Sequence, residues 1–239
     1  QFAGWRAALA VPGLVAIACG VVFLRVAPRE SEAPARRAAA PGVLTAAGRS
    51  RVFAVMTLTA ITGSLLFNFT TNGNAELLKS RLPALPDEPA LLGALLAGVY
   101  ALASLAQLVV GRLIDRVPIK PLMLGILAMQ PPLFVAAAFS DGWPFYATMI
   151  LFMLVVFGAI PFTDALVVRF LDDRMRSRVS GMRLAVSFGV SSAAVWALGP
   201  AVKAAGFTTL LLAMAMIAAC SVAIASLLPG EPVPQRQSA

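Results

Sequence analysis

The side chains that most often carry out covalent chemistry are scarce or poorly placed in this sequence. Histidine is absent, and Cys19 and Cys220 lie inside long apolar runs without the spacing of metal ligands. The acidic pair Asp172–Asp173 stands in a strongly basic turn, where solvated salt bridges are the ordinary outcome. No phosphate-binding loop and no paired nucleophile and base can be identified. We therefore expect a protein that is not an enzyme and that uses no metal or cofactor.

The residues suited to non-covalent recognition are polar side chains embedded in uncharged stretches. Asn68 begins a run of amides and hydroxyls on one helical face, and Tyr100 and Gln107 share another face. Ser192 and Trp196 lie in a later run, with Trp196 near its middle. Such side chains within a membrane-spanning helix face either a cavity or another helix. From helical face and estimated depth we predict that these five residues contact a solute, while a polar contact between helices stays open as the alternative.

The composition indicates that lipid is the solvent of this chain. Hydrophobic residues make up 59% of it and charged residues 13%, about half the charge of a soluble domain. The apolar residues come as long runs rather than at helical or strand periods. The net charge of +8 does not indicate a nucleic-acid partner, because the basic residues flank the apolar runs and form no face with aromatic residues.

Seven charge-free windows can be read from the sequence, and each approaches the ~20 residues that cross a ~30 Å hydrocarbon core as a helix. They are 7–24, 52–75, 89–111, 121–140, 142–163, 184–202 and 204–230. Strands of a membrane barrel would be half as long and would alternate in polarity. The sequence therefore predicts an all-α membrane protein with seven transmembrane helices. In the fifth span, Gly158 and Pro161 mark a kink.

The basic residues predict the orientation of these spans. Fifteen of the 19 Lys and Arg lie in segments 25–51, 112–120 and 169–183 and in the tail after 230. Because loops rich in Lys and Arg stay on the cytoplasmic side, we expect these segments to face the cytoplasm and the intervening loops to face outward. We expect a multi-pass protein of the cytoplasmic membrane, in contact with membrane lipid.

A short charged turn, GRLIDRVPIK at residues 111–120, separates two of the uncharged runs. Asp115 precedes a proline and stands among Arg112, Arg116 and Lys120. This spacing predicts a local cluster of ion pairs and helix caps at the cytoplasmic face. The alternative is an ordinary basic turn of a helical membrane protein.

The turn resembles the loop signature of the major facilitator superfamily of transporters, which reads Gly, any residue, Leu, any residue, Asp, Arg, any residue, Gly and two basic residues. The matching positions are Gly111, Leu113, Asp115, Arg116 and Lys120. Pro118 and Ile119 stand where the signature has its second Gly and its first basic residue. The start at residues 4–6, GWR, followed by Pro12 and Gly13, is similar to the sixth helix of that family. Residues 178–181 loosely resemble the passage between its tenth and eleventh helices.

This resemblance implies a fold and a function. Residues 1–24 would be the last helix of the N-terminal half, 25–51 a cytoplasmic linker, 52–230 the C-terminal six-helix bundle and 231–239 a cytoplasmic tail, with five more spans upstream. The function implied is secondary active transport of a small solute by alternating access, coupled to an ion, with protons as the candidate. The solute site would lie between this half and the missing N-terminal half. The turn at 111–120 would clamp the cytoplasmic side in one state, which assigns gating roles to Gly111, Arg112, Asp115 and Arg116.

Asp164 is the one carboxylate in the fifth span. Its position, 21 residues after Trp143, places it ~31 Å along the helix, at the inner interface. There we expect a structural or gating ion pair with Arg169, or with Arg174 or Arg178. Proton carrying by Asp164 stays open as a second role.

Two other classes of membrane protein remain open at this stage. A receptor or sensor with seven helices would hold its ligand site within this chain. A non-transporting subunit of a larger complex would need no solute site at all.

Overall fold

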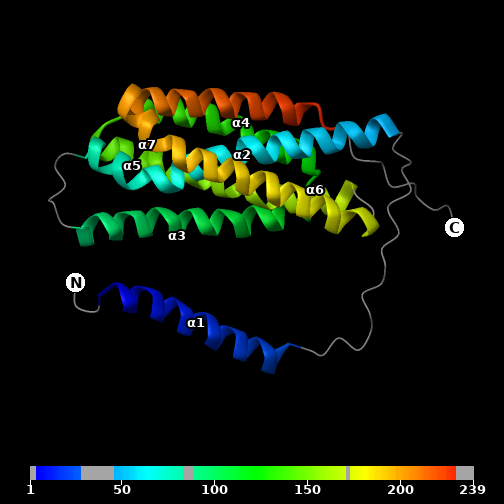
Figure 1. Cartoon of the computed structure of the whole chain (residues 1–239), viewed down its shortest axis with the longest axis horizontal. Helices are drawn as coiled ribbons and strands as arrows, with labels where there is room; N and C mark the ends of the chain where they lie inside the picture. The colour runs from blue at the N-terminus through cyan, green and yellow to red at the C-terminus, as the bar shows by residue number, and fades with distance from the viewer. Residues whose placement is uncertain (1–3, 28–45, 83–88, 171–172, 230–239) are drawn as a thin grey trace. The chain divides into compact units, whose positions relative to one another are not determined.

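The computed structural model of the chain describes residues 4–27, 46–82, 89–170 and 173–229, and every regular element in these ranges is a helix. The helices are α1 (Gly4–Val26), α2 (Ala46–Arg81), α3 (Pro89–Ile114), α4 (Ile119–Ala138), α5 (Gly142–Gly158), α6 (Ile160–Phe170) and α7 (Asp173–Ser226) (Figure 1). Within them, six stretches are long and apolar enough to cross a membrane: Leu9–Val26, Ser50–Arg81, Pro89–Ile114, Ile119–Ala138, Gly142–Val167 and Ser177–Ser226. The prediction of a multi-pass, all-helical membrane protein is confirmed at this level.

The chain divides into two compact units, Gln1–Arg37 and Ala38–Ala239. The first contains α1, in which no residue of the apolar stretch Leu9–Val26 is buried. Leu9, Phe23 and Leu24 are among its widely exposed side chains. A helix that is apolar all round is stable where lipid or other apolar helices surround it. The second unit contains α2 to α7.

Helix α2 extends well beyond its charge-free window, because the flanking segments 46–51 and 76–81 are also helical. The helix is not interrupted at Gly73, which follows the run of amides and hydroxyls that begins at Asn68. Thr70 Oγ1 donates to the carbonyl of Leu66 at 2.8 Å, and Asn72 Nδ2 donates to the carbonyl of Asn68 at 2.9 Å. Bonded to the preceding turn, these polar side chains do not draw the backbone out of the helix.

The fifth predicted span is interrupted at Ala159, between α5 and α6. Gly158 ends α5, and Pro161 is the second residue of α6, where its missing N–H costs no helical bond. The predicted kink between these two residues is therefore confirmed. A β-carbon at Gly158 would lie 3.3 Å from Val110 Cγ2, so glycine lets α5 approach α3 closely.

Helix α7 changes direction at Gly206, whose φ of 75° and ψ of 168° are not helical. Figure 1 shows the chain running along the bundle, turning back and returning. We call residues 173–205 the first arm of α7 and residues 207–226 its second arm. The sequence interpretation of residues 172–183 as a charged turn is wrong from Asp173 onward, because this segment is the beginning of the first arm.

Two clusters of buried side chains form the interior of the second unit. One joins α2, α3, α4, α5 and the second arm and includes Leu78, Phe134, Phe152 and Leu211. The other lies around the short connection between α3 and α4 and includes Val55, Ile119, Leu166 and Leu228. Members of both clusters line one cavity, for example Leu66 of the first and Leu166 of the second.

Polar contacts tie the helices together at each end of the unit. At the end predicted to face outward, Arg81 bonds Asp141 at 2.8 Å, the carbonyl of Ala138 at 3.2 Å and Thr208 Oγ1 at 2.6 Å. At the opposite end, Lys120 Nζ donates to the carbonyl of Leu228 at 2.5 Å. Arg81 therefore links the last turn of α2 to the α4–α5 connection and to the start of the second arm.

Replacing Arg81 by alanine is expected to destabilise the protein by about 2 kcal/mol, because hydrogen bonds from a charged donor contribute about 1.5–3 kcal/mol. The side chain of Arg81 is largely buried, whereas Asp141 is exposed, so the Asp141→Asn variant should lose less than about 1 kcal/mol. The midpoint of thermal unfolding in detergent measures both effects. Lys79→Ala, which removes an exposed pair with Glu76, is the control. Equal midpoints for Arg81→Ala and Lys79→Ala would contradict the role of Arg81.

Candidate functional site

The first arm of α7 presents a polar stripe along one face. Arg183, Ser187 and Ser191 are spaced by four residues, which places them one above another on a helix. All three line a cavity of about 520 Å³ inside the second unit. Ser192 and Trp196, which the sequence predicted as solute contacts, lie on a neighbouring face of the same arm.

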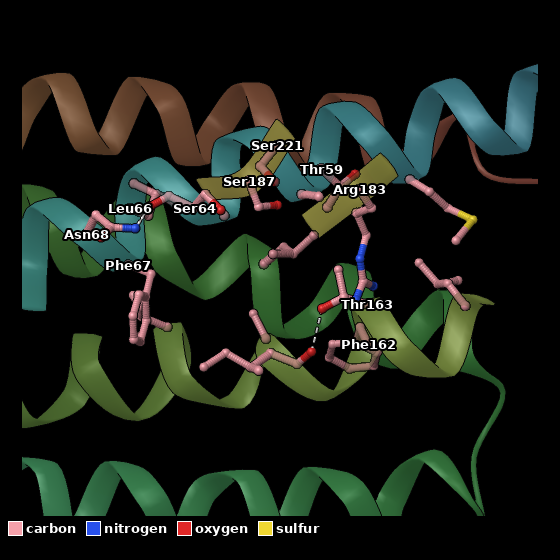
Figure 2. Close-up of a pocket in the computed structure, with 18 of the residues that line it drawn as sticks. Thr59, Ser64, Leu66, Phe67, Asn68, Phe162, Thr163, Arg183, Ser187 and Ser221 are labelled. Carbon is pink, nitrogen blue, oxygen red and sulfur yellow. Dashed lines mark hydrogen bonds between the residues drawn. The ribbon is translucent and has the colours of Figure 1, made fainter. Parts of the chain in front are cut away.

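The cavity is lined by residues of α2, α4, α5, α6 and both arms of α7 (Figure 2). Its polar lining consists of Thr59, Ser64, Asn68, Gln130, Thr163, Arg183, Ser187, Ser191 and Ser221. Its apolar lining includes Met56, Phe67, Leu127, Phe162, Leu166 and Phe188. This mixture of apolar walls with a few convergent polar groups is typical of small-molecule sites.

At one end of the cavity, a hydrogen bond joins α2 to the first arm. Asn68 Nδ2 donates to Ser191 Oγ at 2.7 Å and to the carbonyl of Ser64 at 2.9 Å. Both donor hydrogens of the Asn68 amide are therefore used. The bond fixes the separation of these two helices at this level.

The other end of the cavity carries an ion pair between α6 and the first arm. Arg183 Nη2 lies 2.7 Å from Asp164 Oδ1, and the side chain of Arg183 is 12% exposed against 78% for Asp164. The predicted ion pair of Asp164 is present, but the partners proposed from the sequence do not include Arg183. The reason is that residues 173–183 are helical, which turns Arg183 toward the cavity. The side chain of Arg178 is exposed, and those of Arg169 and Arg174 lie outside the described part of the structure.

Several polar atoms around the cavity are buried without a hydrogen-bond partner. They include Arg183 Nη1, Thr59 Oγ1 and Gln130 Oε1, and Gln130 is only 2% exposed. Pro131 has no N–H, so the carbonyl of Leu127 receives no helical bond from it. Buried polar groups are normally satisfied, and orphans gathered around one cavity indicate a place where a bound molecule or water completes them.

The electrostatic character of the cavity is set by Arg183. Among the described residues that line it, Arg183 alone carries a charge, since Asp164 lies outside the lining. No group of three or more potential metal-binding residues occurs in the part of the chain that the structure describes. The lining can bind, orient and release a solute through hydrogen bonds and one cation.

Of the five residues predicted to contact a solute, Asn68 lines the cavity. Tyr100 instead joins α3 to α2: its hydroxyl donates to the carbonyl of Thr71 at 3.1 Å and accepts from Asn74 Nδ2 at 3.4 Å. Gln107 is partly buried on α3, which contributes no lining residue. The structure therefore does not bring Tyr100 and Gln107 together with Asn68 at one site.

The two remaining candidates, Ser192 and Trp196, are exposed on the first arm. Ser192 Oγ donates to the carbonyl of Phe188 at 3.0 Å, and Trp196 is 80% exposed. Neither lines the cavity. They could contact a solute only on the outer surface of this unit.

The predicted cluster of ion pairs and caps at the turn after α3 is not formed. The turn is closed by backbone bonds, from Arg116 N at 2.9 Å and Val117 N at 2.8 Å, both to the carbonyl of Leu113. Within the described ranges, no ion pair joins Asp115 to Arg112, Arg116 or Lys120, and α4 begins without a side-chain cap. Arg112, Asp115 and Arg116 are exposed, and Gly111 continues α3 in helical conformation. Water satisfies exposed charges at little cost, so a backbone-closed turn does not need them paired.

The residues missed by sequence reasoning had a readable signal. Ser187 and Ser191 were visible at i and i+4, and extending this spacing one turn back reaches Arg183. Arg183 was instead assigned to a loop. Gln130 stood out as an amide in an apolar span, but nothing in one sequence shows that it faces the same cavity as Thr59 and Ser221.

Comparison with known proteins adds no identification. No protein-family model matches the chain, and no curated protein matches it.

Proposed function

We propose that the second unit is a six-helix half of a secondary active transporter of the major facilitator type, which moves a small solute by alternating access. The observation that carries this proposal is the cavity: polar side chains from α2, α4, α6 and both arms of α7 line it within membrane-spanning stretches. Polar groups at that depth are costly in lipid and mark solute pathways. The resemblance of the turn at 111–120 to the facilitator loop supports the same assignment.

We propose that the described part of the chain forms seven spans, six of them in the second unit. The last apolar stretch, Ser177–Ser226, holds 50 residues and would be ~75 Å long as one straight helix. A hydrocarbon core is ~30 Å thick, so the two arms on either side of Gly206 are two spans. With α2, α3, α4 and the α5–α6 pair they make six, and α1 is the seventh.

The basic residues gather at one end of the second unit, and this asymmetry supports an orientation in the membrane. In Figure 1 the start of α2, the α3–α4 turn, the start of the first arm and the end of the second arm lie at the same end. That end carries the basic segments 112–120 and 173–183. We propose that it faces the cytoplasm and that the protein belongs to the cytoplasmic membrane.

Labelling single cysteines from outside intact cells tests this orientation. Starting from a variant without Cys19 and Cys220, Ser140→Cys should react with a membrane-impermeant maleimide, and Val117→Cys should react only after the cells are opened. Ser140 and Val117 stand at opposite ends of α4. Equal reaction of both positions in intact cells would reject the topology.

Two contacts give the alternating mechanism its physical basis. The Asn68–Ser191 bond lies toward the outward end of the cavity, and the Arg183–Asp164 pair lies toward its cytoplasmic end. The resemblance to the facilitator family implies a solute site between the two halves, whereas this cavity lies within the second unit. We propose that one of the two links separates while the other holds as the solute moves between the cavity and either side. Asp164 is the acidic group at the second link, which makes it the candidate in this unit for coupling to protons.

Solute exchange in proteoliposomes tests the proposed function. The intact protein, with all segments encoded by its gene, is reconstituted and loaded with unlabelled compounds from a panel of organic acids, amines and neutral solutes. We expect at least one labelled counterpart to accumulate by saturable exchange, with none in protein-free vesicles. Saturable binding without exchange for every compound would support a receptor instead and reject the transporter.

A further inference from the structure

We propose that the cavity binds an amphipathic organic anion. Its oxyanion head is held by Arg183, and its apolar body lies against the aromatic wall formed by Phe67, Phe162 and Phe188. This inference deepens the proposed function and rests on it only for the claim that the bound anion is transported. It names the chemical class of the solute, which the fold alone leaves open.

The guanidinium of Arg183 has two terminal nitrogens, and only one of them has a partner. Nη2 is engaged by Asp164 Oδ1 at 2.7 Å, while Nη1 is buried and has no partner, and Arg183 is a lining residue of the cavity. A guanidinium presents parallel N–H groups that match the oxygens of a carboxylate or phosphate. The ion pair with Asp164 holds the guanidinium in position. Figure 2 shows Arg183 reaching down from the first arm beside Thr163. An oxyanion at Nη1 would supply the missing partner.

The charged group of the cavity lining favours an anionic solute. The lining contains the guanidinium of Arg183 and no carboxylate, because Asp164 is exposed and outside it. Asp164 compensates Arg183 from the exposed side, so a cationic solute inside the cavity would meet the guanidinium and no carboxylate of the lining. An anionic solute gains a charge-assisted hydrogen bond, which is stronger than a neutral one.

The rest of the cavity lining is mostly apolar and sets the size and polarity of the solute. Phe67, Phe162 and Phe188 line the cavity together with aliphatic side chains, so most of the solute surface would contact apolar groups. A volume of about 520 Å³ is within the ordinary range for sites that hold small organic molecules. Gln130 Oε1 offers an unused acceptor for a donor group on the same solute. A strongly hydrated inorganic anion would leave the aromatic wall and Gln130 without partners.

The test uses three probes with the same apolar body and different heads: 4-phenylbutyrate, 4-phenylbutyramide and 4-phenylbutylamine. Each is titrated into the intact protein in a neutral detergent, and the thermal unfolding midpoint is followed, since a ligand of the native state raises it. We expect the carboxylate to raise the midpoint and the amide and amine to leave it unchanged at the same concentrations. In Arg183→Gln the apparent affinity for the carboxylate should fall at least about tenfold, the effect of losing a charged hydrogen bond. The control, Lys203→Gln, removes an exposed positive charge outside the cavity and should keep the wild-type affinity.

The outcomes separate this inference from the proposed function. No shift with the carboxylate, equal shifts with all three probes, or an unchanged affinity in Arg183→Gln would overturn the anion site. If Arg183→Gln does not fold, the midpoint shifts that the three probes cause in the unsubstituted protein decide whether the cavity prefers an anion. Arg183-dependent binding without exchange in proteoliposomes would keep the anion site and reject transport. Exchange of an amine by a protein that does not bind the carboxylate would keep transport and reject the anion site.

Discussion

A tryptophan at position 191 is expected to reduce solute exchange by the intact protein at least about tenfold. Ser191 lines the cavity and accepts the bond from Asn68 at one of its ends. The indole would occupy space between α2 and the first arm and would remove that bond. Overpacking costs about 1–3 kcal/mol, and about 2 kcal/mol, the middle of this range, corresponds to roughly a thirtyfold loss of affinity. Initial rates of exchange in proteoliposomes, at matched protein content, measure the effect.

The matched control for this prediction is Ser226→Trp. Ser226 is exposed at the end of the second arm, outside the cavity, and its hydroxyl donates only to the carbonyl of Ala223. The same side chain is added there, so any general effect of tryptophan on insertion or folding appears in both variants. Exchange that survives in Ser191→Trp would show that the solute does not pass through the cavity.

Replacing Gly206 by alanine is expected to destabilise the protein by about 1–3 kcal/mol. With φ of 75° and ψ of 168°, this residue occupies a region of backbone space that is essentially restricted to glycine. There is open space around it, so the cost comes from the backbone rather than from a clash. Because Gly206 is where the chain turns between the two arms of α7, the strain falls on the packing of both arms. The thermal unfolding midpoint in detergent measures the loss.

Gly189→Ala provides a control of opposite sign. Gly189 lies within the first arm in helical conformation, and an added β-carbon would meet nothing within 4 Å. Alanine at a helical position stabilises by roughly 0.5–1 kcal/mol relative to glycine. A lower midpoint in Gly189→Ala than in Gly206→Ala would contradict the backbone assigned to Gly206.

The membrane-spanning stretches could be predicted because lipid imposes a simple rule on sequence. Charges are excluded from the hydrocarbon core, so charge-free windows mark where the chain crosses it. These windows do not mark helix ends. Residues 76–81 hold Glu76, Lys79 and Arg81, which are good helix formers, and α2 continues through them. The charged segment 173–183 is also helical. Because its charges were taken as the mark of a loop, the beginning of the first arm was missed.

The candidate site could be predicted only in part, because which way a side chain faces depends on packing between distant segments. Asn68 was identified because an amide in an apolar helix is unusual in itself. Tyr100 looked equally suitable, but Asn74 and the carbonyl of Thr71 hold its hydroxyl between α2 and α3. Arg183 was overlooked since its burial results from the approach of α6, which one sequence does not reveal. The polar residues were visible in the sequence, and their common cavity was not.

The two links at the ends of the cavity also set a length. Arg183 and Ser191 are eight residues apart on the same helical face, which corresponds to about 12 Å along the first arm. A molecule shorter than this fits with both links intact, whereas a longer one must hold one of them apart. The spacing of two side chains on one helix would then limit the length of a solute that can be occluded. Compact acids would be occluded from both sides, and extended acids would keep the protein open to one compartment.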